Sequence, residues 1–173
     1  MSFGIKMETG KIRKYDSEIT VRENDDWYYR GDQITQEKVL DFFRKNLFED
    51  ENGIFIQNTY KNLKENGYIT ALGFPLHITN FVKDEDELFL RGNNSECVPI
   101  KEWIFYFRPI DERIFGIRKN QKFLKYGFSR DFLNFISSYL KEIDGEYYLH
   151  LNSTKIPILR FQENFSVQSP KFN

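Results

Sequence analysis

The sequence predicts an α+β protein of two related halves, each with one helix packed on a mainly antiparallel β-sheet. Composition is one reason, because 18 Phe and 10 Tyr stand against a single alanine, and large planar side chains favour strands. The second reason is that only two segments carry apolar residues at helical spacing, whereas roughly ten short segments read as strands. Parallel βαβ units would need more helices than these two.

A third reason is an internal similarity between the two helical segments. A shift of 93 residues aligns Val39–Leu47 with Phe132–Leu140, and the apolar positions of the two segments then coincide. In each copy a hydroxyl residue precedes the helix and a glycine turn follows it, namely Thr35 with Asn52-Gly53 and Ser129 with Asp144-Gly145. Because coinciding apolar positions solve the same packing problem, they predict a duplicated helix–turn–strand unit.

The N-terminal half is predicted to span residues 18–82. Residues 1–17 are polar and aperiodic, which indicates a loose leader. Thr35 is expected to cap a helix from Gln36 to Phe48, whose apolar stripe contains Val39, Phe43 and Leu47. The remaining segments read as a hairpin and three strands: Glu18–Arg22 with Asp26–Arg30, then Gly53–Asn58, Gly67–Leu72 and Leu76–Val82.

The C-terminal half is predicted to span residues 83–160. The charged run Lys83–Glu87 is expected to be the boundary between the halves, and Ser129 is expected to cap a helix over Arg130–Glu142. Residues 161–173 are polar with isolated aromatics, which indicates a flexible tail. The predicted strands are Leu88–Arg91, Cys97–Ile100, Trp103–Arg108, Arg113–Arg118, Lys122–Tyr126, Glu146–Leu151 and Lys155–Leu159.

Charge and composition exclude several classes of protein. The formal net charge of −1 gives no electrostatic basis for binding nucleic acid or an anionic membrane. Cys97 is the single cysteine, so an internal disulfide is impossible. The N-terminus has no apolar signal region, and no apolar run is long enough for a membrane span. We therefore expect a cytoplasmic protein.

The residues that most often carry catalysis or bind metals are few. His77, His150 and Cys97 are the whole set of histidines and cysteines, and their spacing matches no zinc motif. No phosphate-binding glycine loop occurs. The acidic runs Glu49–Glu51 and Asp84–Glu87 do not fit a calcium loop and read as solvated turns. The sequence thus predicts no metal site, no cofactor and no catalytic residue, and it favours a binding protein over an enzyme.

One basic segment is the main candidate for binding. Between residues 118 and 130 there are five cations and no acid, with aromatic residues between them. On a hairpin that turns at Lys119–Gln121 and leads into a helix, these side chains and backbone donors could hold a phosphate or an acidic peptide. The alternative is a solvated hairpin whose aromatics pack inward. The candidate binding residues are Arg118, Lys119, Lys122, Lys125 and Arg130.

The order of several short motifs resembles a known family. The motifs are Trp27-Tyr28-Tyr29-Arg30-Gly31, the Val39–Leu47 helix pattern, Asn52-Gly53, Tyr68-Ile69-Thr70 to Phe74-Pro75-Leu76, and Val98-Pro99-Ile100. Over most of residues 20–155 this order resembles the bacterial domain of unknown function 1285 family and a related uncharacterised mitochondrial family, domain of unknown function 4505. The resemblance implies a two-part α+β protein with no established activity, for which ligand binding or signalling is the usual suggestion. Lys64-Glu65-Asn66-Gly67 stands where the mitochondrial relatives have an arginine-rich stretch, so no site is carried over.

These observations lead to one functional hypothesis and two rivals. The leading hypothesis is a small binding or regulatory protein whose partner, an unknown small molecule or protein, binds in the cleft between the halves. The first rival is a hydrolase or transferase that uses Cys97, His77 or His150 brought together in space. The second is a protein–protein adaptor that binds through the basic hairpin.

Overall fold

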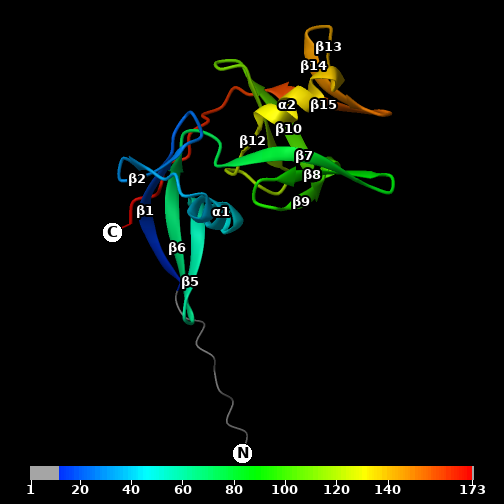
Figure 1. The fold of residues 1–173 in the computed structure, drawn as a ribbon. Helices are drawn as coiled ribbons and strands as arrows, with labels where there is room; N and C mark the ends of the chain where they lie inside the picture. The colour runs from blue at the N-terminus through cyan, green and yellow to red at the C-terminus, as the bar shows by residue number, and fades with distance from the viewer. Residues whose placement is uncertain (1–11, 173) are drawn as a thin grey trace, which may run out of the picture.

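The computed structural model describes residues 12–172, which form two β-sheets with one α-helix each (Figure 1). The first sheet has six strands in the order β3-β2-β1-β6-β5-β4. Its elements are β1 (Arg13–Val21), β2 (Trp27–Tyr29), β3 (Asp32–Gln33), α1 (Glu37–Lys45), β4 (Leu47–Asp50), β5 (Gly53–Tyr60) and β6 (Leu63–Ala71).

The second sheet has nine strands in the order β13-β14-β15-β10-β11-β12-β7-β8-β9. Both sheets are mainly antiparallel, so the predicted fold class is confirmed, with more short strands than expected. The elements of the second sheet are β7 (Leu76–Asp84), β8 (Glu87–Gly92), β9 (Cys97–Pro99), β10 (Trp103–Arg108), β11 (Arg113–Arg118), β12 (Tyr126–Phe128), α2 (Arg130–Ile136), β13 (Leu140–Ile143), β14 (Glu146–Leu151) and β15 (Thr154–Arg160).

The two sheets share one connectivity. In the first, β1, β2, β3, α1, β4, β5 and β6 follow one another, and β1 pairs with β6 in parallel. In the second, β10, β11, β12, α2, β13, β14 and β15 follow one another, and β10 pairs with β15 in parallel. We call these two sets of elements the first and second unit. All their other strand pairings are antiparallel, and each pairing in the first unit has a counterpart at the same place in the second. Strands β7–β9 are an addition at the β12 edge of the second unit.

This connectivity places the boundary between the sheets before the predicted position. The run Lys83–Glu87 is the turn of the β7–β8 hairpin, in which Glu85 adopts a positive φ of 50°. Strand β7 therefore belongs to the second sheet, and the predicted boundary at residue 83 is wrong. The chain passes between the sheets at Leu72–Pro75, where the proline cannot continue a strand ladder. The predicted boundary was misplaced because a charged run marks any solvated turn.

Both helices are shorter than predicted. Helix α1 ends at Lys45, and Leu47 instead begins β4, which pairs with β5 across the Asn52-Gly53 turn. The predicted Thr35 cap is wrong, because Gln36 holds the N-cap position and makes no side-chain cap bond. Helix α2 ends at Ile136 and is followed by a single 3₁₀ turn. The Ser129 cap is confirmed, since its hydroxyl accepts the N–H of Phe132.

The two predicted flexible ends contain ordered contacts. Residues 1–11 of the predicted leader lie outside the described residues, but Arg13–Ser17 are in β1, parallel to β6. Residues 161–172, which we call the C-terminal segment, leave the second sheet and cross to the first. There Val167 is 8% exposed and exchanges two backbone hydrogen bonds with Ala71, of 2.8 and 2.9 Å. The segment is polar in composition, but its isolated aromatic and aliphatic residues pack on both halves.

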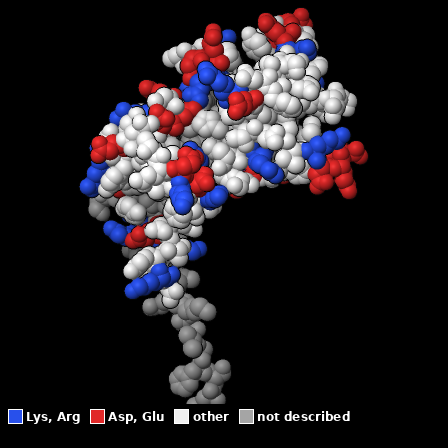
Figure 2. All heavy atoms as spheres, viewed as in Figure 1, with Lys and Arg blue, Asp and Glu red and all other residues white. Residues whose placement is uncertain are grey.

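An aromatic cluster fills the junction between the sheets. Phe74 is fully buried, and its ring centroid lies 5.3 Å from that of Phe115 and 4.9 Å from that of Phe165. Phe74 lies in Leu72–Pro75, where the chain crosses between the sheets, Phe115 lies in the second sheet, and Phe165 lies in the C-terminal segment. Tilted and edge-to-face aromatic pairs at such distances add to the stability that burial provides. The junction is thus a packed core. Figure 2 shows acidic and basic side chains interspersed over the visible face of the protein.

Candidate functional site: a basic cavity beside the junction

The basic segment forms a packed loop instead of a hairpin. We call Lys119–Lys125, between β11 and β12, the basic loop. The predicted strand over Lys122–Tyr126 is wrong, because β12 begins only at Tyr126. The loop starts with a turn in which the N–H of Gln121 donates to the carbonyl of Arg118 at 2.9 Å.

A carboxylate from the first sheet holds the basic loop. The Glu49 side chain, at the end of β4, accepts hydrogen bonds from three consecutive backbone N–H groups, those of Lys122 (2.6 Å), Phe123 (2.9 Å) and Leu124 (2.6 Å). Successive N–H groups that converge in this way form a concave anion site. The sequence left open that backbone donors of this segment could hold an external anion, but Glu49 occupies those of Lys122–Leu124. The acidic run 49–51 is therefore more than a solvated turn.

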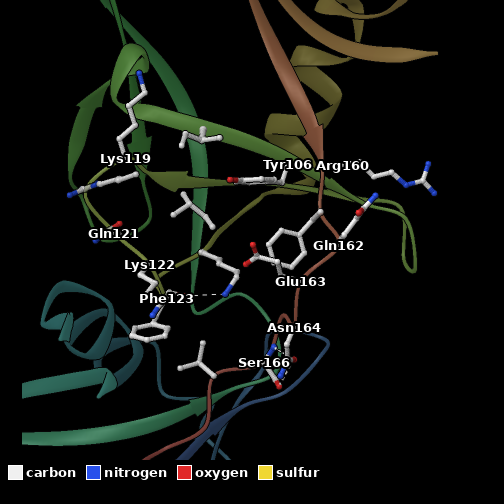
Figure 3. Close-up of a pocket in the computed structure, with 16 residues that line it drawn as sticks. Tyr106, Lys119, Gln121, Lys122, Phe123, Arg160, Gln162, Glu163, Asn164 and Ser166 are labelled. Atoms are coloured by element: carbon white, nitrogen blue, oxygen red, sulfur yellow. Dashed lines mark hydrogen bonds between the residues drawn. The ribbon is translucent and has the colours of Figure 1, made fainter. Parts of the chain in front are cut away.

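A cavity of about 610 Å³ lies beside this loop. The basic loop, strands β10 and β11, the end of β15 and the C-terminal segment form its walls. Figure 3 shows Glu163 near the centre of the view below Tyr106, whereas Lys119 and Arg160 extend outward at its periphery. Four of the five predicted binding residues line this cavity, namely Arg118, Lys119, Lys122 and Lys125.

Lys125 is the cation that the fold buries. The residue is 5% exposed, and its Nζ donates to the carbonyl oxygens of Phe123 (3.4 Å) and Phe165 (3.2 Å). Among residues 12–172, no carboxylate forms an ion pair with it. Burial lowers the pKa of Lys125 to about 8, although the negative charges of Glu49 and Glu163 act in the opposite direction. A buried ammonium without an anionic partner is costly, and an anion in the cavity would relieve that cost.

Arg118 is already engaged by the protein. Its guanidinium forms an ion pair with Glu96 and lies over the rings of Trp103 (5.8 Å) and Tyr126 (5.7 Å). Burial raises the pKa of Tyr126 to about 12, so its hydroxyl stays protonated at neutral pH. The charge of Arg118 is therefore balanced inside the fold, in contrast to that of Lys125.

The fifth predicted residue, Arg130, lies elsewhere. It lines a second cavity of about 630 Å³ together with Asp25, His77, Arg113 and Ser129, which we call the junction cavity. There His77 Nε2 lies 2.8 Å from Asp25 Oδ2. Arg113 also donates to both oxygens of Asp25, and the backbone N–H of Phe74 donates to one of them at 2.7 Å. Nothing in the sequence distinguishes Asp25 as a site residue, because the surrounding Glu23–Asp26 run reads as a solvated turn.

The carboxylate of Asp25 stays ionised in this cluster. Burial acts to raise its pKa, but the hydrogen bonds from His77, Arg113 and Phe74 outweigh burial and lower the pKa below its usual value. The cluster joins the β1–β2 turn to β7 and β11. It is therefore a polar connection between the two halves as well as the wall of a cavity.

The other suspected catalytic residues are not brought together. Cys97 is exposed in β9, at one edge of the second sheet, whereas His150 is in β14, next to the opposite edge. No hydrogen bond among the described residues joins any two of Cys97, His77 and His150. Over residues 12–172, no group of three or more His, Cys, Asp and Glu side chains could hold a metal ion. In the same residues, neither helix has the length and apolar character that a membrane crossing requires.

Comparison by sequence identifies no relative. No protein-family model matches the chain, and no curated protein matches it. The structure, in contrast, is similar to crystal structures of DUF1285 family proteins from two bacteria. The protein from Shewanella baltica OS155 is 17% identical with a TM-score of 0.48, over 70% of this chain and 91% of that one.

The argument about the fold depends on the similarity to the other of these two proteins. The DUF1285 family protein from Silicibacter pomeroyi DSS-3 is 13% identical, with a TM-score of 0.63 over 86% of this chain and 84% of that one. At this identity the likeness concerns the fold alone. The resemblance to the mitochondrial family stays a prediction. The resemblance to the domain of unknown function 1285 family, predicted from short motifs, is confirmed by a shared fold.

Proposed function

We propose that this protein is a small binding or regulatory protein that takes a small anionic molecule in the basic cavity. The observation that carries this proposal is Lys125, a buried cation that lines a cavity and has no carboxylate at ion-pair distance within the described part of the chain. A buried charge is costly unless an opposite charge and hydrogen bonds balance it or the group loses its charge. A carboxylate or phosphate group of a ligand would supply this balance.

The size and chemistry of the cavity support a small molecule. A volume of about 610 Å³ falls in the range of roughly 300–1,000 Å³ that is typical of small-molecule sites. Exposed Lys119 and Lys122 add positive charge at the rim, and Tyr106 and Phe123 provide aromatic surface for an apolar part of the ligand. Among the described residues, Glu163 is the single acid that lines the cavity. The lining thus favours an anion with an apolar portion.

The position of the cavity supports a regulatory role. The basic loop is held by Glu49 of the first sheet, and the C-terminal segment is paired with Ala71 of the same sheet. A ligand in the basic cavity would therefore contact two segments whose positions depend on the other half. We also infer that the two units arose by duplication, because their connectivity and pairing coincide element by element.

Binding can be tested by thermal shift with anionic metabolites, nucleotides and phosphopeptides on the wild type, K125M and K38M. Lys38 is exposed on α1, so K38M removes one charge without touching the cavity. We expect an anionic compound to raise the melting temperature of the wild type and of K38M but not of K125M. Without ligand, K125M should be at least as stable as the wild type, because methionine removes a buried charge. Equal ligand shifts in all three proteins would contradict the proposal.

A second candidate function rests on the junction cavity. His77 and Asp25 are a titratable pair at 2.8 Å in a cavity that Ser129 also lines, which favours a hydrolase more than the scattered cysteine and histidines do. Against it, Arg113 engages both oxygens of Asp25, and the Ser129 hydroxyl caps α2. Hydrolysis of phosphate or carboxylate esters that H77A abolishes, with its melting temperature retained, would support the hydrolase. Equal rates in H77A and the wild type would exclude it.

A further inference from the structure

We infer that the ligand of the basic cavity carries a carbonyl group beside its anionic group, and that the Lys125 amine captures this carbonyl as an imine. The inference rests on the proposed function and adds the chemical class of the ligand, a small oxo acid. Three features of the site carry it: the rigid position of Lys125, the surroundings of its nitrogen and the presence of Glu163.

Lys125 lies on a firmly held segment. The three residues before it donate their backbone N–H groups to Glu49. The residue after it, Tyr126, pairs with Gly116 of β11 and with Leu76 of β7. A reactive group must be held close to its productive geometry, and such a position between two anchored segments provides this better than a mobile loop.

The surroundings of the nitrogen suit a neutral amine. A neutral lysine nitrogen has two N–H groups and one lone pair, whereas the ammonium has three N–H groups. The carbonyls of Phe123 and Phe165 are the two hydrogen-bond acceptors of Nζ among the described residues, and the centroid of the Phe165 ring lies 5.0 Å from it. The two carbonyls match the two N–H groups of the amine, which leaves the lone pair for a group in the cavity that Lys125 lines.

A substantial fraction of Lys125 is in the neutral amine form near neutral pH. With a pKa of about 8, caused by burial, about a tenth of Lys125 is neutral at pH 7, against fewer than about one in a thousand for an exposed lysine. Desolvation of a lysine in an apolar pocket is a known way to activate it as a nucleophile toward carbonyl groups. The remaining ammonium form attracts the anionic group of the incoming ligand.

The step needs no oxidant or reductant. The Nζ lone pair attacks the carbonyl carbon, the C=O π electrons move to oxygen, and transfer of a proton from nitrogen to oxygen gives a carbinolamine. Protonation of its hydroxyl then releases water as the C=N bond forms and nitrogen loses its second proton. Glu163, which lines the cavity and interacts electrostatically with Lys125, is the carboxylate placed to take a proton from nitrogen and pass it to the departing hydroxyl. The sum is amine plus carbonyl to imine plus water.

Reductive trapping tests the inference on the full chain. The protein is incubated with pyruvate and sodium cyanoborohydride at pH 8, and the modified lysines are located by peptide mass spectrometry. Lys119 and Lys122 line the same cavity but are exposed, so they are matched controls inside one molecule. We expect Lys125 to be labelled at least about tenfold faster than either, because of its larger neutral fraction. This preference should vanish in denatured protein.

Parallel measurements separate this inference from the proposed function. Lactate has the same charge as pyruvate but no carbonyl, and its binding is followed by calorimetry on the wild type and K125R. If lactate binds and pyruvate labels Lys119, Lys122 and Lys125 equally, imine formation is overturned while anion binding stands. If neither compound binds or labels Lys125, the inference fails for this ligand class. Selective labelling of Lys125 in the wild type supports it whether or not K125R folds.

Discussion

At the scale of single residues, the crossing between the sheets depends on a glycine. A Cβ atom added to Gly73 would lie 2.1 Å from the carbonyl oxygen of Arg22 and 2.6 Å from Asp25 Oδ1. Because the first of these atoms is backbone, it cannot move aside cheaply, and G73A should lower the free energy of unfolding by about 2 kcal/mol or more. Urea unfolding measures this change.

Gly31 provides the control for that substitution. Its φ is +94°, but nothing lies within 4 Å of the position of an added Cβ. G31A therefore introduces only an unfavourable backbone conformation, which costs about 1 kcal/mol. A G73A variant that is no less stable than G31A would show that the crossing is looser than the structure indicates.

Also at the residue scale, Asp50 makes stability depend on pH. Burial acts to raise its pKa, but hydrogen bonds from Tyr68 (2.5 Å) and Lys14 (2.9 Å) lower it to about 2. Since the folded-state pKa is below the unfolded value, the stabilisation is present above pH about 4 and is lost as the pH falls toward about 2. D50N should cost roughly 1–2 kcal/mol at pH 7. The difference from the wild type in urea unfolding should shrink between pH 4 and 2, and a constant difference would contradict this account.

At the scale of elements, the end of β4 positions the basic loop. E49Q keeps the size of the side chain but weakens three hydrogen bonds, of which those from Phe123 and Leu124 are partly buried, and we expect a loss of about 2 kcal/mol. Amide exchange at residues 122–124 should accelerate, which mass spectrometry can follow. Glu51 is exposed in the next turn, so E51Q is the matched control and should be neutral. Unchanged exchange in E49Q would show that Glu49 does not hold the loop.

Elements also show where the sequence is informative and where it is not. The two helices, their spacing and the Ser129 cap were predictable, because amphipathic periodicity and capping are local. The ends of the helices were not, since Leu47 and Leu140 fit an apolar helix stripe but pair as strands across glycine turns. Glu49 and Glu51 are alike in the sequence, and only the packing of one half on the other distinguishes them. Lys125 could likewise be predicted from the sequence as one of five candidate cations, but its burial could not, because that also depends on tertiary packing.

At the scale of the whole molecule, the C-terminal segment connects the two sheets and forms a wall of the basic cavity. Val167 is buried against Ala71, so V167D should destabilise the protein by about 3 kcal/mol and weaken anion binding in the cavity. The neighbouring Gln168 is exposed, and Q168D should change neither property. Thermal unfolding and titration with the anion identified by the screen measure both effects. If V167D destabilised the protein but bound the anion normally, the segment would not be part of the site.

The parallel pairing of the first and last strands in each unit has a consequence for synthesis of the chain. Strand β1 ends at Val21, but its partner β6 begins only at Leu63, so β1 is translated well before the edge it must join. At roughly 5–20 residues per second, ribosomes need on the order of a few seconds to add the intervening chain. For that time the nascent protein presents an open strand edge, which is the feature most prone to pairing with another chain. Strand β10 likewise precedes its parallel partner β15, so the second unit has the same vulnerable interval.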